Sequence, residues 1–217
     1  MKTFTVHSCG PIRAEILIPG DKSMSHRSAM FASLAQGRST ITGFLEAEDC
    51  LSTISAMRDL GARIERTGAG AFVVEGTSGQ LSQPVVDVDC GNSGTTMRLL
   101  SGIIASQPIR ARMIGDASLS KRPMGRVIRP LTEMGAHFTS EGGDGKPPLI
   151  VQGGQLSPLA YEMPVASAQV KSAILLAGLS AVGETSVIEP AACRDHTERM
   201  LQAVSYTHLT LPTNREV

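Results

Sequence analysis

Polar and charged side chains gather in the stretch GDKSMSHR at residues 20–27. The apolar run AEILIP at 14–19 precedes it and the pattern SAMFASLAQG follows, which predicts a strand, a glycine turn and a helix start. The unpaired N–H groups and the dipole of a helix start attract anions. Lys22 and Arg27 add positive charge suited to phosphate, and Ser23 adds a hydroxyl. These residues therefore predict a site for a phosphate or carboxylate group.

Two later stretches have the same arrangement. GNSGTT at 91–96 and ASAQVKS at 166–172 each follow a predicted strand and open a predicted helix. Gly94 allows backbone N–H groups to approach a ligand closely. The loop SLSKRPMG at 118–125 adds Arg122, which the following proline keeps out of a helix. If the three stretches belong to units related by rotation, their helix starts converge and form one anion site.

An internal repeat supports that arrangement. Residues 54–76 and 128–153 both read as an amphipathic helix, a Leu/Met-Gly-Ala step, a strand, a glycine-rich turn and a second strand. The matching residues Gly61 and Gly135 are 74 positions apart, and glycine suits the left-handed residue that ends a helix. With the elements upstream, the unit is β-α-β-α-β-β. Several such units must pack together, so we predict an α/β (α+β) fold of repeated units around a pseudo-threefold axis.

The third copy of the unit is incomplete. A strand, a helix and a strand are predicted within 160–190, and a second helix begins in 193–204. The remaining stretch SYTHLTLPTNREV, at 205–217, has neither a helix stop signal nor a pair of hairpin strands. We interpret 205–217 as a non-native tail and leave it out of the fold prediction.

Composition excludes several classes of function. Lys+Arg and Asp+Glu balance at 20 each, which argues against a general nucleic-acid or membrane-surface binder. Aromatic residues make up 3% of the chain and there is no Trp, so base-stacking platforms are not expected. The four cysteines lack zinc spacing and read as free thiols in a reducing cytoplasm. No metal, cofactor, signal peptide or membrane span is expected.

Each candidate residue also has a purely structural interpretation. Ser23, Asn92 and Ser167 could each be only a helix N-cap. Arg27 and Arg98 could be solvated helix residues. His26 is interpreted as a packing or hydrogen-bonding residue rather than a catalyst. The joint pattern favours function, because repeats kept only for packing have no reason to differ in their helix-start loops.

Five ordered motifs carry a resemblance to a known family. The chain resembles the 5-enolpyruvylshikimate-3-phosphate synthases, also called 3-phosphoshikimate 1-carboxyvinyltransferases, up to about residue 203. The motifs are GDKSMSHR at 20–27, GNSGTTMRLL at 91–100, GDASLSKRPMG at 115–125, ASAQVKSAILLAGL at 166–179 and RDHTERML at 194–201.

The resemblance implies a domain organisation. Members of the family have two domains of three β-α-β-α-β-β units each, with the active site between them. Residues 16–204 would be the first domain, and 1–15 would be a strand segment associated with the second. The second domain of the family supplies an Asp, a Lys–Glu pair and two Arg, so we expect this chain alone to be inactive. The whole protein is expected to be a cytoplasmic monomer.

The resemblance also implies a reaction in the shikimate pathway toward chorismate and the aromatic amino acids. The enolpyruvyl group of phosphoenolpyruvate would pass to the 5-hydroxyl of shikimate 3-phosphate through a tetrahedral intermediate, with release of phosphate and no cofactor. Lys22 would be catalytic. The residues implied for shikimate 3-phosphate are Lys22, Ser23, Arg27, Ser167 and Ala168. The residues implied for phosphoenolpyruvate are Lys22, Asn92, Gly94, Thr95, Arg122 and Gln169.

Ala168 departs from some relatives, Gly94 bears on inhibition, and two alternative functions remain open. Some relatives have Ser where this chain has Ala168, which removes one hydroxyl contact. Glyphosate competes for this site in the family, and Gly94 implies sensitivity in an intact enzyme. One alternative is a non-catalytic half that only binds shikimate 3-phosphate. The other, UDP-N-acetylglucosamine enolpyruvyl transferase, has Lys-Asn in its first motif and a catalytic Cys in its mobile loop, which 118–125 lacks.

Overall fold

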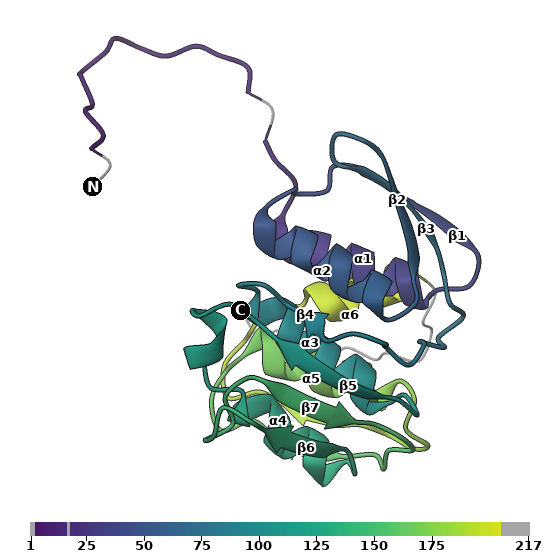
Figure 1. Ribbon diagram of the computed structural model, residues 1–217. Helices are drawn as coiled ribbons and strands as arrows, with labels where there is room; N and C mark the ends of the chain where they lie inside the picture. The colour runs from purple at the N-terminus through teal and green to yellow at the C-terminus, as the bar shows by residue number, and fades with distance from the viewer. Residues whose placement is uncertain (1–2, 17, 205–217) are drawn as a thin grey trace.

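The computed structural model describes residues 3–16 and 18–204 of the 217-residue chain. The described residues before Gly20 form an extended arm that leaves the body of the protein, and the remainder folds as packed helices and sheets (Figure 1). In this described part, none of the helices combines the length and the hydropathy that crossing a membrane requires.

The first unit pairs two helices with a three-stranded antiparallel sheet. Its strands lie in the order β1-β3-β2, with Ile41 opposite Phe72 in the core-facing register. The bounds of the elements are α1 Lys22–Leu34, β1 Arg38–Ile41, α2 Glu48–Asp59, β2 Arg63–Gly68 and β3 Ala71–Glu75. The predicted helix–strand–helix–hairpin order is therefore confirmed for this unit.

The second unit follows the same order and has one more strand. Its sheet is ordered β4-β5-β7-β6, with β4 parallel to β5 and the other pairs antiparallel. The bounds are β4 Val88–Asp89, α3 Gly94–Ala105, β5 Arg110–Ile114, the 3-10 turn η1 Leu119–Lys121, α4 Gly125–Glu133, β6 His137–Ser140 and β7 Leu149–Gln152.

The third unit is described as far as its second helix. It contains β8 Ala160–Glu162, α5 Ala168–Gly178, β9 Ser186–Ile188 and α6 His196–Ala203, and β8 is parallel to β9. The stretch 205–217, interpreted as a non-native tail, lies outside the described residues.

The predicted strand at 14–19 is wrong. Its described residues are in no strand, and Ile16 and Ile18 are 71% and 76% exposed. In the other two units the strand before the helix pairs in parallel with the strand after it, whereas β1 pairs only with β3 among the described residues. An apolar run becomes a strand only where its backbone finds a partner, and the described residues of this run leave the body of the protein (Figure 1).

The repeated glycines end equivalent helices in the same way. Gly61 and Gly135 have φ angles of +96° and +111°, in the left-handed range that favours glycine. After α2, the N–H groups of Gly61 and Ala62 donate to the carbonyls of Arg58 and Met57 at 2.9 and 3.0 Å. The corresponding pair after α4 repeats both bonds at 3.0 Å each. This is the Schellman pattern, so the prediction from the repeat is confirmed.

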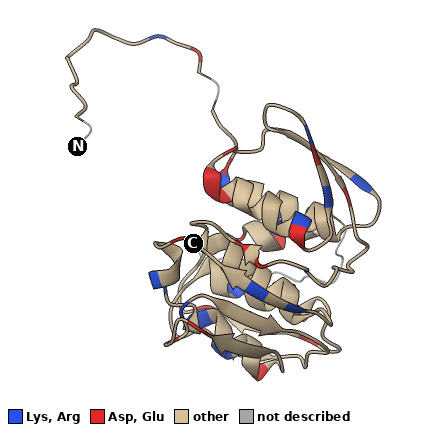
Figure 2. Cartoon of the chain, in the orientation of Figure 1, with Lys and Arg blue, Asp and Glu red and all other residues tan. Residues whose placement is uncertain are grey.

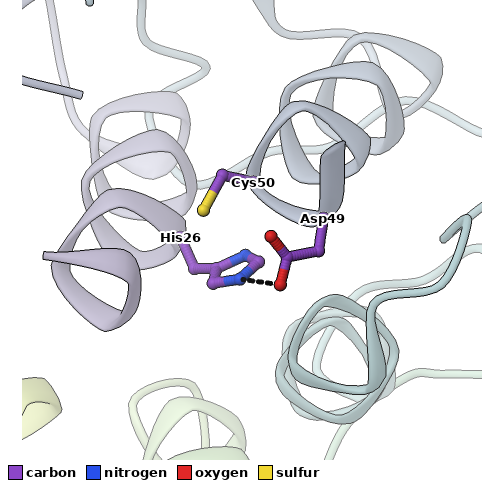
Figure 3. A group of neighbouring side chains, drawn as sticks. All are labelled: His26, Asp49 and Cys50. Carbon is purple, nitrogen blue, oxygen red and sulfur yellow. Dashed lines mark ion pairs between the residues drawn. The ribbon is translucent and has the colours of Figure 1, made fainter. Parts of the chain in front are cut away.

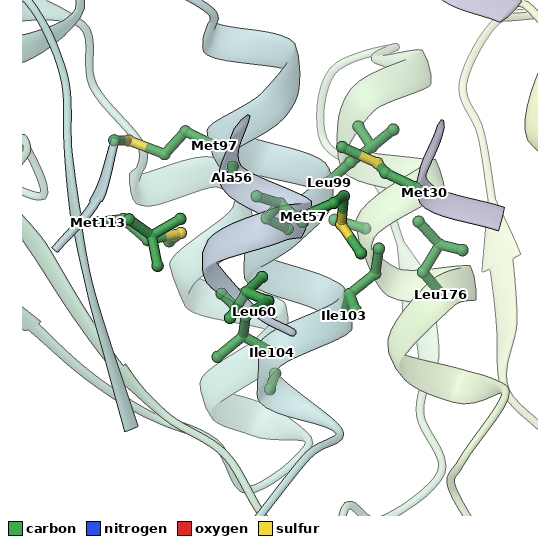
Figure 4. Close-up of a cluster of buried hydrophobic side chains, with 14 of the residues drawn as sticks. Met30, Ala56, Met57, Leu60, Met97, Leu99, Ile103, Ile104, Met113 and Leu176 are labelled. Carbon is green, nitrogen blue, oxygen red and sulfur yellow. The ribbon is translucent and has the colours of Figure 1, made fainter. Parts of the chain in front are cut away.

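One hydrophobic core joins the three units. Helices α3 and α5 lie at its centre, and Gly102 allows the α3 backbone to approach Ala173, whose carbonyl oxygen would be 2.2 Å from an added Cβ. Figure 4 shows methionine, leucine and isoleucine side chains from α1, α2, α3, β5 and α5 in contact across this centre. Because elements of all three units share the core, the helix starts keep fixed positions relative to one another. Fully buried members include Met30, Met57, Leu60, Met97, Leu99, Leu100, Ile104 and Met113.

Candidate substrate site

A polar cleft of about 520 Å³ opens where the starts of α1, α2, α3 and α5 meet. Apart from one glycine, its lining residues all carry polar or charged side chains, and they come from all three units and the η1 loop. They are Lys22, Glu48, Asp49, Asn92, Gly94, Thr95, Arg98, Arg122 and Gln169. The predicted convergence of helix starts is therefore found in the structure.

The three predicted helix starts are capped by side chains. Asp21, Ser93 and Ser167 each accept a hydrogen bond from the backbone N–H three residues later, at 2.8, 3.1 and 3.4 Å. The N-cap interpretation thus holds for Ser167. It is wrong for Ser23, which lies inside the first turn of α1 after the cap Asp21, and for Asn92, which precedes the cap Ser93.

Lys22 lies at the edge of the cleft and is held by Asp49. The Lys22 ammonium forms an ion pair with the Asp49 carboxylate, whose side chain is 14% exposed. Burial acts to raise the pKa of Asp49, but the hydrogen bond and charge of Lys22 outweigh it and the pKa lies below its ordinary value. Acidic residues at the start of α2 are visible next to α1 in Figure 2. Lys22 is therefore oriented before any ligand arrives.

A second cation, Arg98, forms hydrogen bonds with residues on different walls of the cleft. Its Nη1 donates to Gln169 Oε1 at 3.0 Å and its Nη2 donates to the Pro123 carbonyl at 3.3 Å. Gln169 Nε2 in turn donates to Thr95 Oγ1 at 2.9 Å. Burial, followed by the charges of neighbouring arginines, lowers the pKa of Arg98. The interpretation of Arg98 as a solvated residue is wrong, because it links α3, α5 and the η1 loop.

Gly94 leaves room for two guanidinium groups at the start of α3. A Cβ added there would lie 2.6 Å from Nη1 of Arg98 and 3.4 Å from Nη1 of Arg122. Arg122 is exposed, and its Nη2 donates to Ser118 Oγ at 3.1 Å. The start of α3 therefore combines its own free N–H groups with two positive side chains, which suits an anion with several oxygens.

A buried hydrogen-bonded group lies on the other side of α1. Arg27 is 2% exposed and donates from Nη1 to Ser23 Oγ at 2.7 Å, from Nε to Thr197 Oγ1 at 2.6 Å and from Nη2 to Ser172 Oγ at 2.8 Å. Ser172 Oγ then donates to the Ala168 carbonyl at 2.6 Å. Burial lowers the pKa of Arg27 to about 10, so the guanidinium keeps its charge at neutral pH. This group joins α1 to the start of α5 and to α6. The interpretation of Arg27 as a solvated helix residue is therefore wrong.

One cluster in the described chain has the residue types of a metal site. His26, Asp49 and Cys50 place one ligand atom each within 4.8 Å of one another (Figure 3). Two features oppose a bound cation. The Lys22 ammonium already pairs with the Asp49 carboxylate, and burial raises the pKa of Cys50 to about 12, which disfavours the thiolate. The cluster is therefore described by its hydrogen bonds rather than as a metal centre.

The structure divides the predicted site residues into two groups. The residues that line the cleft are Lys22, Asn92, Gly94, Thr95, Arg122 and Gln169. Ser23 and Arg27 belong to the neighbouring buried group, which reaches the Ala168 carbonyl through Ser172. Ser167 precedes Ala168 as the N-cap of α5. Sequence reasoning missed Glu48 and Asp49, although two adjacent carboxylates at the start of the next predicted helix were visible. It also missed Ser172 and Thr197, whose hydroxyls lie inside two of the quoted motifs.

Comparison with known proteins places the chain among relatives of one kind. Residues 6–207 match the family model described as EPSP synthase (3-phosphoshikimate 1-carboxyvinyltransferase). Proteins with the latter name are 56% identical in Novosphingobium aromaticivorans, over 89% of this chain and 44% of that protein, and 49% identical in Legionella pneumophila, over 95% and 48%. The chain thus spans somewhat less than half the length of the curated relatives it matches.

A solved structure gives the same result. The EPSP synthase from Acinetobacter baumannii superposes with a TM-score of 0.85 at 53% sequence identity, over 88% of this chain and 43% of that one. The likeness therefore covers the fold as well as the motifs.

Proposed function

Because the chain belongs to the EPSP synthase family, we propose that it forms the half of a 3-phosphoshikimate 1-carboxyvinyltransferase that holds both substrates. One observation carries this proposal. The six residues that the family resemblance implies for phosphoenolpyruvate come from separate parts of the chain, yet all of them line one cleft beside the buried Arg27 group.

Phosphoenolpyruvate would lie over the start of α3. Its phosphate and carboxylate carry charge that Lys22 and Arg122 would neutralise, while Gly94 exposes backbone N–H groups to an oxygen. Asn92 and Gln169 would complete the pocket with amide hydrogen bonds. Arg98 would act through Gln169 by keeping its amide oriented.

Shikimate 3-phosphate would lie beside it, against Ser23, Arg27 and the start of α5. Ser167 is the N-cap of α5, and the helix dipole stabilises an anion at this N-terminus. Ala168 has no polar side chain and would contact the substrate only through its backbone. Lys22, between the two positions, would contact both substrates.

The proposed reaction is an addition followed by an elimination. The 5-hydroxyl of shikimate 3-phosphate gives up its proton as its oxygen bonds to C2 of phosphoenolpyruvate, and C3 takes up a proton. The tetrahedral species then loses phosphate from C2 and a proton from C3, which leaves the enolpyruvyl ether and inorganic phosphate. The residues of this chain would orient the two reactants and stabilise the charge of the departing phosphate through Lys22.

The proposal extends to the domain organisation, the oligomeric state, glyphosate inhibition and the location of the protein. Residues 16–204 would form one domain of the enzyme and 1–15 would associate with the half that the relatives have in addition. We propose a monomeric whole protein that glyphosate inhibits. A cytoplasmic location is supported by the four cysteines, all of them free thiols. Residues 205–217 would be a non-native tail.

The binding-only alternative is favoured for the 217-residue polypeptide itself, because the matched relatives are more than twice as long as the matched region. This polypeptide would bind shikimate 3-phosphate and leave turnover to the remaining half. UDP-N-acetylglucosamine enolpyruvyl transferase is disfavoured, because Ser23 follows Lys22 and residues 118–125 contain no Cys.

Titration calorimetry with shikimate 3-phosphate tests the proposal directly. The 217-residue chain should bind it, and Lys22→Met should weaken binding at least tenfold, since a charge-assisted contact is lost. Lys121→Met is the matched control, because this exposed lysine in η1 does not line the cleft. Absence of binding by a folded wild-type chain, or equal effects of the two variants, would contradict the proposal.

A further inference from the structure

A buried chain of hydrogen bonds runs from His26, which lies near Lys22 and Asp49, to the start of α3. His26 Nδ1 lies 2.6 Å from Thr53 Oγ1, which lies 2.7 Å from Thr96 Oγ1. Thr96 Oγ1 donates to Ser93 Oγ at 2.7 Å. The four side chains come from α1, α2 and α3 with its N-cap, and none of these residues is more than 2% exposed.

The direction of these bonds fixes the position of the imidazole proton. Because Thr96 gives its hydroxyl proton to Ser93, it must accept from Thr53. The Asp49 carbonyl is a second acceptor within reach of Thr53 Oγ1, but at 3.5 Å it is much farther than Thr96 Oγ1 at 2.7 Å, so the Thr53 proton belongs to the shorter contact. Thr53 must then accept from His26, so Nδ1 carries the hydrogen. The imidazole is neutral, because burial lowers the pKa of His26 to about 4 despite the opposing charge of Asp49.

The other imidazole nitrogen faces the carboxylate that holds Lys22. Nε2 is buried, has no hydrogen-bond partner among the described residues, and lies 3.8 Å from Asp49 Oδ2 (Figure 3). In the Nδ1–H tautomer, Nε2 carries a lone pair and cannot donate to this carboxylate. Asp49 then remains available to the Lys22 ammonium. A proton on Nε2 would instead be donated to Asp49 and would compete with Lys22.

We propose that His26 is a positioning residue. The Thr53–Thr96–Ser93 hydroxyl chain sets its Nδ1–H tautomer, and because Nε2 then cannot donate to Asp49, the Asp49 carboxylate stays paired with the Lys22 ammonium. The inference rests on the proposed function of Lys22 as a contact to both substrates. It links the N-cap of α3, where phosphoenolpyruvate would lie, to the ammonium that contacts shikimate 3-phosphate.

The tautomer can be observed directly. Long-range ¹H–¹⁵N correlation spectra of the histidine-labelled 217-residue chain should show Nδ1 protonated and Nε2 unprotonated for His26 at pH 7. Thr53→Val removes the acceptor with almost no change in volume and should move the proton to Nε2. Thr53→Ser keeps a hydroxyl and should retain the wild-type tautomer.

The consequence for Lys22 is measured in the same variants. Thr53→Val should weaken the binding of shikimate 3-phosphate about fivefold, the scale of one hydrogen bond, and Thr53→Ser by less than about twofold. Ser101→Ala is the matched control: this buried hydroxyl of α3 donates only to the Met97 carbonyl of its own helix, so its loss should change neither tautomer nor affinity.

The outcomes separate the inference from the proposed function. An Nε2–H tautomer in the wild-type chain, or an unchanged tautomer or affinity in Thr53→Val, would overturn the inference. A wild-type chain that has the Nδ1–H tautomer but does not bind shikimate 3-phosphate would overturn the proposed function and leave the tautomer assignment supported.

Discussion

The first and second units have the same sequence pattern but different sheets. In the second, β4 pairs in parallel with β5, and β7 and β6 complete the order β4-β5-β7-β6. In the first, β1, β3 and β2 correspond to the last three strands, and the run at 14–19 that corresponds to β4 extends into solvent (Figure 1). The difference shows that an apolar run gives the tendency to form a strand, while an available partner edge decides the outcome.

The helix starts of the two units differ as well. The N-cap of α1 is the carboxylate of Asp21, which offsets the positive end of its helix, and the exposed Lys22 supplies the charge there. The N-cap of α3 is the neutral Ser93, and Gly94 leaves the helix end open between two arginines. An anion at α3 thus meets backbone N–H groups, whereas an anion at α1 meets a side chain.

Glycines that follow the last hairpin strand should be equally indispensable in both units. A Cβ at Gly76 would lie 2.0 Å from the Ala35 carbonyl oxygen, and one at Gly153 would lie 2.1 Å from that of Ile104. We expect Gly76→Ala and Gly153→Ala each to lower the free energy of unfolding by roughly 3 kcal/mol or more, because backbone atoms must move. Urea denaturation measures this. Gly154→Ala, where a Cβ meets nothing within 4 Å, is the control, and a tolerated variant at one of the first two sites would break the equivalence.

The strand that the first unit lacks leads to the next largest expected difference in unfolding free energy between equivalent positions of the two units. Val88 in β4 is fully buried, so Val88→Ala should cost about 2 kcal/mol of unfolding free energy. Ile18→Ala should change it by less than about 0.5 kcal/mol, because Ile18 is exposed. The same denaturation experiment compares them. A cost for Ile18→Ala as large as that for Val88→Ala would mean that the arm pairs with the body in solution.

Filling the open start of α3 should weaken binding without unfolding the protein. Gly94→Ala would place its Cβ against the Arg98 guanidinium and displace that flexible side chain from Gln169. We expect the affinity for phosphoenolpyruvate, measured by calorimetry in the presence of shikimate 3-phosphate, to fall about tenfold. Gly125→Ala at the start of α4 meets nothing within 4 Å and should have no effect. Unchanged affinity in Gly94→Ala would contradict the placement of this substrate.

Removing the charge of the α1 N-cap should have the smallest effect. Asp21→Asn keeps an N-cap oxygen for the Met24 N–H but removes a negative charge near Lys22. The affinity for shikimate 3-phosphate should rise about twofold at low salt, and the gain should fade at high salt. A lower affinity in the variant would show that Asp21 contributes to binding through more than its charge.

Much of this account could be predicted from the sequence, because periodic signals determine it. The repeat fixed the order of helices and strands after residue 20, and Gly61 and Gly135 marked two helix ends correctly. The strand at 14–19 could not be judged, since a single sequence does not show whether a partner edge is available. The convergence of the helix starts followed from the repeat. The contacts of Arg98 and Arg27 did not, because they depend on which helices meet across the core.

The most direct test of the central claim is phosphate release by the purified 217-residue chain with shikimate 3-phosphate and phosphoenolpyruvate, alone and mixed with the separately prepared second half of a close relative. The account predicts no release by either half alone and release by the mixture, lost again when this chain carries Lys22→Met. No release by the mixture, although the two halves associate and this chain binds shikimate 3-phosphate, would contradict the claim that the cleft supplies a competent substrate site.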